Sequence, residues 1–332
     1  MKTVLATAPG KVVLSGEYAV LDGAPAIALA VDRRAQVAIR QQARGPHRID
    51  APGLAAAERR FTVHSGEFDW QDDLPPWKLL ECCWRAACVD APEPLAIRLD
   101  TRAFRDPGSG LKIGVGSSAA LASALSAALC TVAAGESDPR QIAMRAHRDF
   151  QHGKGSGLDV ATSFSGGVVE YRMEEPCGRR QPWPDGLHYA ILWSGVEVDT
   201  AARIARLAGT EVHSSRQALV DAAAAVAAAW RSAAPAAVLD SLVSYVVTLE
   251  RFSADHELGV FDAGHAALVG MARRDGLVYK PCGAGGGDIG IVLGTDVNAI
   301  EAFVGLAADG GFVKTNLNID NAGARTEAAR SD

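Results

Sequence analysis

The sequence predicts a mixed α and β protein with two domains, and three observations lead to this prediction. At 332 residues the chain is long enough for two hydrophobic cores. Short segments with strand character alternate with alanine- and leucine-rich segments of helical character. Residues 176–186 are rich in Pro, Gly and Arg, which is typical of a boundary, so we expect domains over residues 1–180 and 181–332.

The composition argues against several functional classes. A net charge of −6 disfavours a general nucleic-acid or anionic-membrane surface. No stretch reaches the roughly 18 apolar residues expected of a membrane span, and the first residues have too short an apolar run for a signal peptide. The six cysteines lack a C-x-x-C pair or zinc-ligand spacing. We therefore expect reduced thiols in a cytoplasmic enzyme.

The first hundred residues are expected to be rich in strands. Two short β-rich pieces flank Pro9-Gly10, a dipeptide that interrupts strand pairing and bends the chain. Lys11 is therefore expected at the edge of a turn, held by strands. Further strands are expected at residues 31–41, 61–63 and 95–99, and a helix at residues 78–89.

A glycine-rich loop then opens onto a long Ala/Leu helix. Gly114 and Gly116 have no Cβ, so the backbone can turn sharply and approach a ligand closely. Ser117 and Ser118 are natural N-cap residues for the helix that follows. A helix N-terminus behind a glycine turn is a place for phosphate. The order fits neither the Walker A nor the dinucleotide fingerprint, so an ordinary turn before a core helix is the alternative.

A second glycine-rich loop follows the next helix. Asp138-Pro139 has the form of a cap and first turn, and the helix is expected to run to about Gln151. Three glycines within five residues then lead to Asp159, and a strand is expected at residues 168–171. A helix N-cap is the structural alternative for Asp159.

The remaining chain surrounds a third glycine-rich segment, residues 283–288. A strand is expected to enter this segment and another to leave it. Strands are expected at residues 189–193, 289–293 and 313–319, helices at residues 200–207, 214–231, 239–252, 260–273 and 297–307, and a frayed tail at residues 322–332.

The three loops, in this order, resemble the GHMP kinase superfamily, which includes galactokinase, homoserine kinase, mevalonate kinase and phosphomevalonate kinase. The matching segments are residues 8–11 (Ala-Pro-Gly-Lys), 114–119 (Gly-Val-Gly-Ser-Ser-Ala) and 283–288 (Gly-Ala-Gly-Gly-Gly-Asp). Residues 16–21 look more like phosphomevalonate kinase, because mevalonate kinases usually carry His where Tyr18 stands. Residues 155–159 and 280–282 also look like phosphomevalonate kinase. The chain is rather short for that family, with little between residues 65 and 77 or around residue 177.

The resemblance implies a fold, cofactors and a substrate. It implies an N-terminal ATP-binding and catalytic domain with an unusual left-handed βαβ crossover, and a ferredoxin-like C-terminal domain. The substrate would bind in a cleft between them. ATP and Mg²⁺ are the implied cofactors, and a small alcohol, most simply phosphomevalonate, is the implied acceptor. No nucleic-acid or membrane partner is expected, and the oligomeric state is left open.

The resemblance also assigns residue roles. Asp159 matches the catalytic aspartate and Lys11 its partner. Asp159 would accept or orient the proton of the acceptor hydroxyl, and a purely electrostatic role for the pair is the alternative. ATP phosphates would bind to Lys112, Gly114, Val115, Gly116, Ser117, Ser118 and Ala119, with Mg²⁺ near Ser118. The acceptor would bind to Glu17, Tyr18, Lys154, Ser156, Gly157, Gly283, Ala284, Gly285 and Gly286.

A phosphate on the acceptor needs local cations in a chain of negative net charge. Lys112 and Lys154 are favoured, because each lies in a glycine-rich loop whose amides can share the anion. His147 and His152 are expected on a helix surface or in packing. The alternatives are mevalonate kinase, another GHMP kinase, an ATP-dependent mevalonate-type decarboxylase and a non-catalytic ATP-binding sensor.

Overall fold

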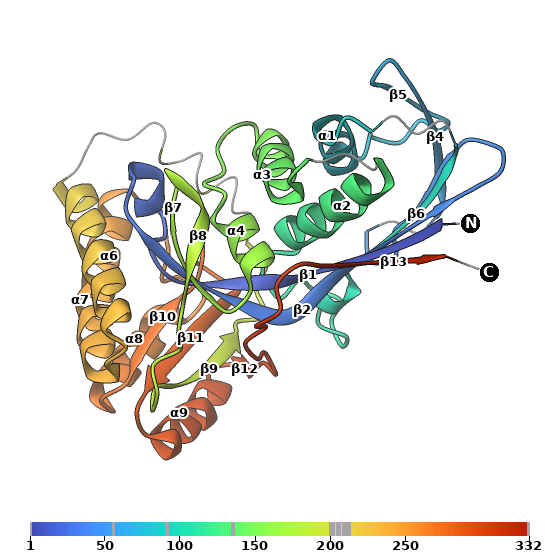
Figure 1. Ribbon diagram of the computed structural model, residues 1–332. Helices are drawn as coiled ribbons and strands as arrows, with labels where there is room; N and C mark the ends of the chain where they lie inside the picture. Colours follow the sequence, from blue (N-terminus) through green and yellow to red (C-terminus); the bar gives the residue numbers. More distant parts are fainter. Residues whose placement is uncertain are drawn as a thin grey trace.

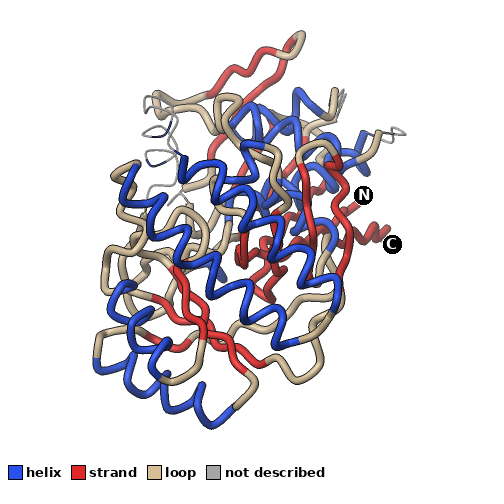
Figure 2. The backbone as a smooth tube through the Cα atoms, turned by 90° about the vertical axis from the view of Figure 1, so that its left-hand side faces the viewer, coloured by secondary structure: helices blue, strands red, loops and turns tan. Residues whose placement is uncertain are grey.

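The computed structural model describes residues 2–54, 57–89, 93–133, 137–198, 203, 207 and 214–330. Two β-sheets form its framework (Figure 1). Helices α1 to α4 lie over one face of the larger sheet, and the long helices α6 and α7 stand beside the smaller one. Figure 2 views the molecule from the side on which the long helices cross the front. The predicted mixed α and β class is confirmed.

The larger sheet has the strand order β13-β1-β2-β6-β3-β4-β5, and β7 pairs with β2 and with β8. Its pairs are antiparallel except for β3 with β6. The strands are β1 (Lys2–Ser15), β2 (Ala26–Gln41), β3 (His47–Asp50), β4 (Arg59–His64), β5 (Glu67–Trp70), β6 (Leu95–Asp100), β7 (Val168–Arg172), β8 (Glu175–Gln181) and β13 (Arg325–Arg330).

Strand β1 passes through Pro9-Gly10 without ending. The pairing with β2 shifts register between these two residues, so the expected interruption is a bulge within one strand. A bulge bends a strand and re-aims its side chains. It therefore lies directly before Lys11, which stays inside the strand.

The helices over the larger sheet are α1 (Lys78–Ala86), α2 (Ser117–Ala133), α3 (Pro139–Phe150) and α4 (Leu158–Ser165), with short 3-10 turns at η1 (Ala19–Asp22) and η2 (Arg102–Phe104). Helix α2 is buried on nearly every side, because its Ala and Ser side chains allow close packing. The side chain of Asp138 accepts a hydrogen bond from the backbone N–H of Arg140 at 2.9 Å, which confirms the predicted cap of α3.

The smaller sheet has the order β10-β11-β9-β12 and is antiparallel throughout. Its strands are β9 (His188–Trp193), β10 (Val278–Pro281), β11 (Ile289–Gly294) and β12 (Val313–Lys314). Helices α6 (Ser214–Ser232), α7 (Pro235–Asp255) and α8 (His265–Arg274) connect β9 to β10, and α9 (Val297–Asp309) connects β11 to β12. This is the βαββαβ sequence of a ferredoxin-like unit, as expected.

The expectation of a frayed C-terminal tail is wrong. Residues 325–330 of the supposed frayed tail form β13, which pairs with β1 along six residues. Residues 176–181, the first part of the segment expected at the boundary, belong to β8, which pairs with β7. The strand expected at residues 313–319 is limited to Val313–Lys314. The helix expected at residues 200–207 lies outside the described residues, apart from Arg203 and Leu207.

The division into domains stays a proposal. The chain leaves the larger sheet at Gln181 and enters the smaller one at His188, but β13 later returns to the larger sheet. One continuous apolar cluster joins side chains of both sheets. The handedness of the predicted crossover also stays a prediction.

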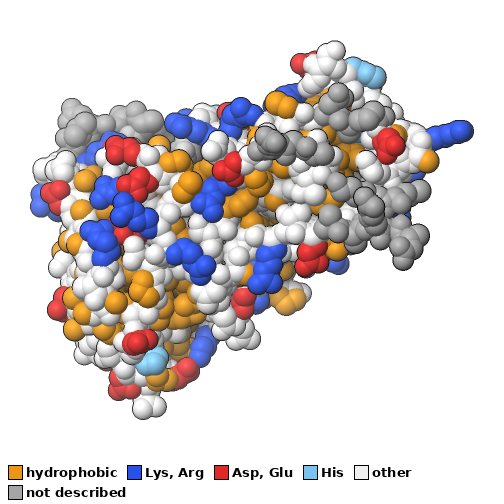
Figure 3. All heavy atoms as spheres, in the orientation of Figure 1, with side chains coloured by type: hydrophobic (Ala, Val, Ile, Leu, Met, Phe, Trp, Pro, Cys, Tyr) orange, Lys and Arg blue, Asp and Glu red, His pale blue; other side chains and the backbone are white. Residues whose placement is uncertain are grey.

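The surface and the thiols agree with a globular chain. All six cysteines are free. Acidic and basic side chains are interspersed on the face that Figure 3 shows. Across the ranges given above, the structure contains no helix with both the length and the apolar character needed to cross a membrane.

Candidate active site

Lys11 lies where strand β1 meets the loop before α2. Its backbone N–H donates to the carbonyl oxygen of Val115 at 2.9 Å. A Cβ on Gly10 would lie 2.5 Å from the same oxygen, so only glycine lets the strand come this close to the loop. The side chain of Lys11 is 11% exposed. The first motif therefore holds the loop of the second motif directly.

The loop of residues 112–119, called the phosphate loop below, needs its glycines. Gly114 and Gly116 have φ angles of 89° and 79°, in the left-handed region that disfavours other residues. A Cβ on Gly116 would lie 3.0 Å from Cε of Lys11. Helix α2 begins at Ser117, so the two serines are its first residues rather than its cap. The first amides of a helix have no acceptor within the helix and remain available to an anion.

Asp159 lies beside Lys11. The Nζ atom of Lys11 is 3.5 Å from Oδ1 of Asp159, whose side chain is 31% exposed. Asp159 lies in the first turn of α4, and the N-cap position belongs to Gly157 with φ 88°. The alternative role of Asp159 as an N-cap is therefore wrong. The carboxylate instead meets the ammonium group from a turn where the helix dipole favours negative charge.

The loop before Asp159 is held from behind by Tyr171 on β7. The Tyr171 hydroxyl donates to the carbonyl oxygen of Ser156 at 2.6 Å. Burial raises the pKa of Tyr171 to about 12, so it remains a donor at neutral pH. A Cβ on Gly157 would lie 2.8 Å from this hydroxyl. Lys154, in the same loop, is exposed.

The third glycine loop closes the other side of the pair. A Cβ built on Gly283 would lie 3.8 Å from Nζ of Lys11. Asp288 packs against the phosphate loop, because a Cβ on Gly114 would lie 2.4 Å from its Cβ and Cγ atoms. Burial raises the pKa of Asp288 to about 6. The three predicted loops and Asp159 therefore converge around Lys11.

Glu17 and Tyr18 connect the first motif to the second half of the chain. Glu17 forms a buried ion pair with Lys280, and its other carboxylate oxygen accepts from the Tyr245 hydroxyl at 2.7 Å. The Tyr18 hydroxyl donates to the carbonyl oxygen of Ala284 at 2.7 Å. The carboxylate of Glu17 thus faces protein partners. Tyr18 touches the third glycine loop.

His147 contacts the phosphate loop, which the sequence analysis did not anticipate. Its Nε2 atom lies 3.1 Å from Oγ of Ser118, and the residue is 2% exposed. Burial lowers the pKa of His147, which favours the neutral ring. The two residues belong to different helices, so no local spacing in the sequence could reveal their contact.

Lys112 has an exposed side chain. Its backbone N–H donates to the carboxylate of Glu197, and it forms an isolated β-bridge with Arg105. The geometry thus fixes the backbone of Lys112 and leaves its side chain exposed. The guanidinium group of Arg145 donates a hydrogen bond to the carbonyl oxygen of Ala86.

The residues near Lys11 and Asp159 offer oxygen atoms of the kind that bind Mg²⁺. No group of three or more His, Cys, Asp or Glu side chains in the described ranges could hold a metal ion. Mg²⁺ is commonly held by one or two protein oxygens together with substrate phosphates. The Ser118 hydroxyl and the Asp159 carboxylate are donors of that kind.

Comparisons with known proteins identify kinases as relatives. Residues 78–167 match the GHMP kinases N terminal domain. The chain is 27% identical to phosphomevalonate kinase of Streptomyces sp. (strain CL190), over 88% of this chain and 90% of that protein. It is 36% identical to mevalonate kinase of Methanothermobacter thermautotrophicus, over 49% of this chain and 48% of that protein.

The fold is similar to that of solved kinases. Streptococcus pneumoniae phosphomevalonate kinase, solved in complex with phosphomevalonate and AMPPNP, superposes with a TM-score of 0.76 at 16% identity. The match covers 95% of this chain and 99% of that chain. At this identity the likeness concerns the fold.

Proposed function

We propose that the chain, whose residues 78–167 match the GHMP kinases N terminal domain, transfers the γ-phosphoryl group of ATP to 5-phosphomevalonate. The observation that carries this proposal is the contact of Lys11 with Asp159 at the meeting point of three glycine-rich loops. A relative that matches 88% of the chain is a phosphomevalonate kinase, which favours this acceptor.

In this proposal the phosphate loop binds ATP. The backbone amides of Gly114, Val115, Gly116, Ser117, Ser118 and Ala119 surround the start of α2, where the helix dipole favours phosphate. Phosphoryl transfer depends mainly on positioning and on charge stabilisation. Mg²⁺ supplies positive charge to the phosphates when bound, and the Ser118 hydroxyl would hold it. His147 fixes the orientation of Ser118.

Asp159 and Lys11 act on the acceptor hydroxyl. The carboxylate of Asp159 orients this hydroxyl and takes up its proton as the phosphoryl group arrives. A weak base suffices, because the transition state is loose and the proton leaves late. The ammonium group of Lys11 lies 3.5 Å from Asp159, so it also stabilises negative charge on the transferred group.

The acceptor lies between the second and third glycine loops. Lys154, Ser156 and Gly157 line it on the side of α4, and Gly283, Ala284, Gly285 and Gly286 on the side of β10 and β11. Tyr18 supports the third loop through Ala284. Glu17 acts from behind, through its buried contacts with Lys280 and Tyr245. Lys112 and Lys154 neutralise the phosphate of the acceptor.

Mevalonate kinase is the second candidate, because several relatives with that activity match about half of the chain. Tyr18, where mevalonate kinases usually carry His, favours phosphomevalonate. A decarboxylase of the same fold and a non-catalytic ATP sensor remain further alternatives. The presence of both Lys11 and Asp159 disfavours the sensor.

An acceptor screen tests the proposal. ATP consumption is measured with mevalonate, 5-phosphomevalonate, homoserine and sugars, and each product is identified by mass. We expect turnover with 5-phosphomevalonate and a product with one more phosphoryl group. Turnover of mevalonate alone would identify a mevalonate kinase, release of CO₂ a decarboxylase, and ATP binding without turnover a sensor.

A further inference from the structure

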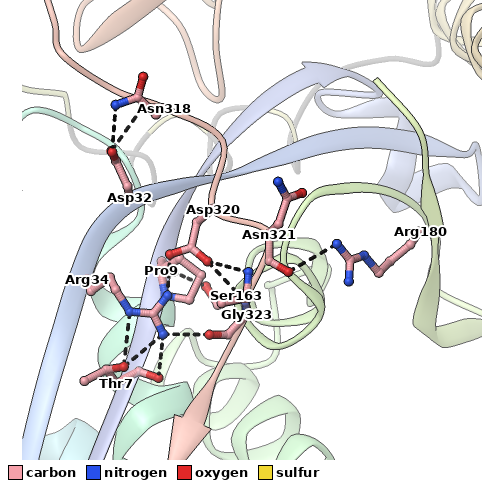
Figure 4. A network of polar contacts seen from close by, with 11 residues as sticks. Thr7, Pro9, Asp32, Arg34, Ser163, Arg180, Asn318, Asp320, Asn321 and Gly323 are labelled. Atoms are coloured by element: carbon pink, nitrogen blue, oxygen red, sulfur yellow. Dashed lines mark hydrogen bonds and ion pairs between the residues drawn. The ribbon is translucent and has the colours of Figure 1, made fainter. Parts of the chain in front are cut away.

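A hydrogen bond joins the helix of Asp159 to the strand of Lys11. The Ser163 hydroxyl donates to the carbonyl oxygen of Pro9 at 2.8 Å (Figure 4). Ser163 is fully buried, and none of the roles assigned above involves it. Pro9 lies two residues before Lys11, and Ser163 lies four residues after Asp159.

The spacing makes this bond a second link beside the ion pair. Residues four apart on a helix lie on the same face, one turn from each other. Asp159 and Ser163 therefore both turn toward β1 from α4, one reaching Lys11 and the other Pro9. The register shift of β1 lies directly after Pro9. The hydrogen bond from Ser163 therefore holds the strand at its bend.

Other contacts hold the far end of α4. The N–H of Ala324 donates to the carbonyl oxygen of Phe164, and the N–H of Gly167 donates to that of Asp320. Asp320 is paired with Arg34 of β2, as Figure 4 shows. These contacts fasten the C-terminal end of the helix to the sheet. The Ser163 bond acts closer to Asp159 and reaches the strand that carries Lys11.

We propose that Ser163 is a positioning residue that sets the separation of the Asp159 carboxylate and the Lys11 ammonium group. The inference rests on the proposed function for its kinetic consequence only. A displacement of about 1 Å in a reacting group can lower a rate by about 10²-fold. Loss of the Ser163 hydroxyl therefore reduces kcat without altering the phosphate loop.

The test compares Ser163→Ala with a matched serine. Ser123 is equally buried, and its hydroxyl donates to the carbonyl oxygen of Ala119 within its own helix at 2.8 Å. For Ser163→Ala with ATP and 5-phosphomevalonate, we expect kcat to fall about 10-fold or more, with the ATP KM within about two-fold of wild type. Ser123→Ala should keep the kcat and the ATP KM of wild type. Ser163→Thr, which keeps a hydroxyl, should restore most of kcat.

A crystal structure of Ser163→Ala supplies the second readout. We expect the distance from Nζ of Lys11 to Oδ1 of Asp159 to exceed its present 3.5 Å, with the start of α2 unchanged. If Ser163→Ala does not fold, Ser163→Cys replaces it, because a thiol is a weak donor. An unchanged distance, or a kcat equal to that of Ser123→Ala, would overturn the inference.

The kinetic and structural readouts distinguish a failure of the proposed acceptor from a failure of the proposed role of Ser163. If wild type does not phosphorylate 5-phosphomevalonate, the proposed acceptor fails. The kinetic comparison then uses the acceptor that wild type does convert, and the measured distance alone decides the role of Ser163 if wild type converts none.

Discussion

Lys112 shows how one cation can serve either of two anions. Its backbone is fixed by Glu197, but its side chain is exposed at the edge of the phosphate loop. In the proposed reaction, the loop amides and Mg²⁺ would already offset much of the charge of ATP. The ammonium group of Lys112 is therefore better used on a phosphate of the acceptor.

Lys112→Met should raise the acceptor KM about 10- to 100-fold and leave the ATP KM nearly unchanged, since a charge-assisted contact contributes about 1.5–3 kcal/mol. Steady-state kinetics with each substrate varied in turn provide the measurement. Lys314→Met is the control, because Lys314 lies on β12 of the smaller sheet and pairs with Glu301 of α9. An effect on the ATP KM alone would assign Lys112 to the nucleotide, and no effect on either would point to Lys154.

His265 supports the third glycine loop from α8. Its Nε2 atom lies 3.1 Å from the carbonyl oxygen of Gly287, which can only accept, so Nε2 carries the proton. Its Nδ1 atom lies 2.8 Å from the Tyr279 hydroxyl and accepts from it. Burial lowers the pKa of His265 from 6.5 to about 4. The folded state therefore favours the neutral ring.

This pKa gives a pH dependence of stability with a definite sign. The stabilisation is complete above pH 6.5 and is lost as the pH falls toward 4, because the unfolded chain binds the proton more readily. Between pH 7 and pH 5, wild type should lose about 2 kcal/mol of unfolding free energy relative to His265→Gln. Urea denaturation of both proteins at both pH values measures this. Asp288, whose pKa is raised, has the opposite sign in both proteins and cancels in the difference. If the unfolding free energies of wild type and His265→Gln differed by the same amount at both pH values, the prediction would be contradicted.

At the scale of elements, one glycine of the phosphate loop and one glycine shortly before that loop allow backbone strain to be separated from side-chain contact. Gly116 and Gly110 have φ angles of 79° and 73°, so alanine strains the backbone similarly at both. A Cβ would touch Lys11 at position 116 and nothing within 4 Å at position 110.

Gly116→Ala should therefore reduce kcat/KM by at least about 10-fold more than Gly110→Ala, while the two variants lose similar stability. Steady-state kinetics and thermal melting of the pair provide the measurement. If both variants lost activity equally, the close approach of Lys11 to Gly116 would have no role in catalysis.

The elements that the sequence predicts well are those with local signals. The side chain of Asp138 caps an amide two residues later, and the glycines at positions 114 and 116 act through their own backbone, so a short window of sequence contains the physical reason for each. Strand β13 shows the opposite case. Its residues 325–330 are mostly polar, and they form a strand because β1 offers a partner more than 300 residues earlier in the chain. No local pattern predicts such a pairing.

The site residues also fall into two groups, those that local sequence patterns predict and those that depend on the packing of distant elements. The glycine motifs indicated Lys11, Asp159 and the three loops, and the structure brings them together. The contacts of His147 with Ser118 and of Ser163 with Pro9 depend on how separate elements pack. A resemblance between motifs carries no information about such supporting residues.

At the scale of the whole molecule, a buried ion pair joins the two sheets. Lys280 on β10 is fully buried and pairs with Glu17, which follows β1, while Tyr245 on α7 donates to the same carboxylate. Removing one partner of such a pair leaves a buried charge without compensation. The connection therefore fixes how the two halves of the site face each other.

Lys280→Met should destabilise the protein by about 3–5 kcal/mol, and adding Glu17→Gln should recover part of the loss, because the second change removes the uncompensated charge. Urea denaturation measures both. The exposed pair Lys314–Glu301 is the control, where Lys314→Met should cost about 1 kcal/mol or less. A similar loss in both single variants would show that the buried pair does not hold the sheets together.

Asp159→Asn tests the proposed kinase reaction most directly. Asp138→Asn is its control, because Asn caps a helix about as well as Asp. Both variants and wild type receive ATP and 5-phosphomevalonate, product is followed by mass, and ATP affinity is measured by calorimetry. We expect Asp159→Asn to lose about 10²–10⁴-fold in turnover with ATP affinity nearly unchanged, while Asp138→Asn stays close to wild type. Turnover of Asp159→Asn within a few-fold of wild type, or no phosphorylated product from wild type, would contradict the account.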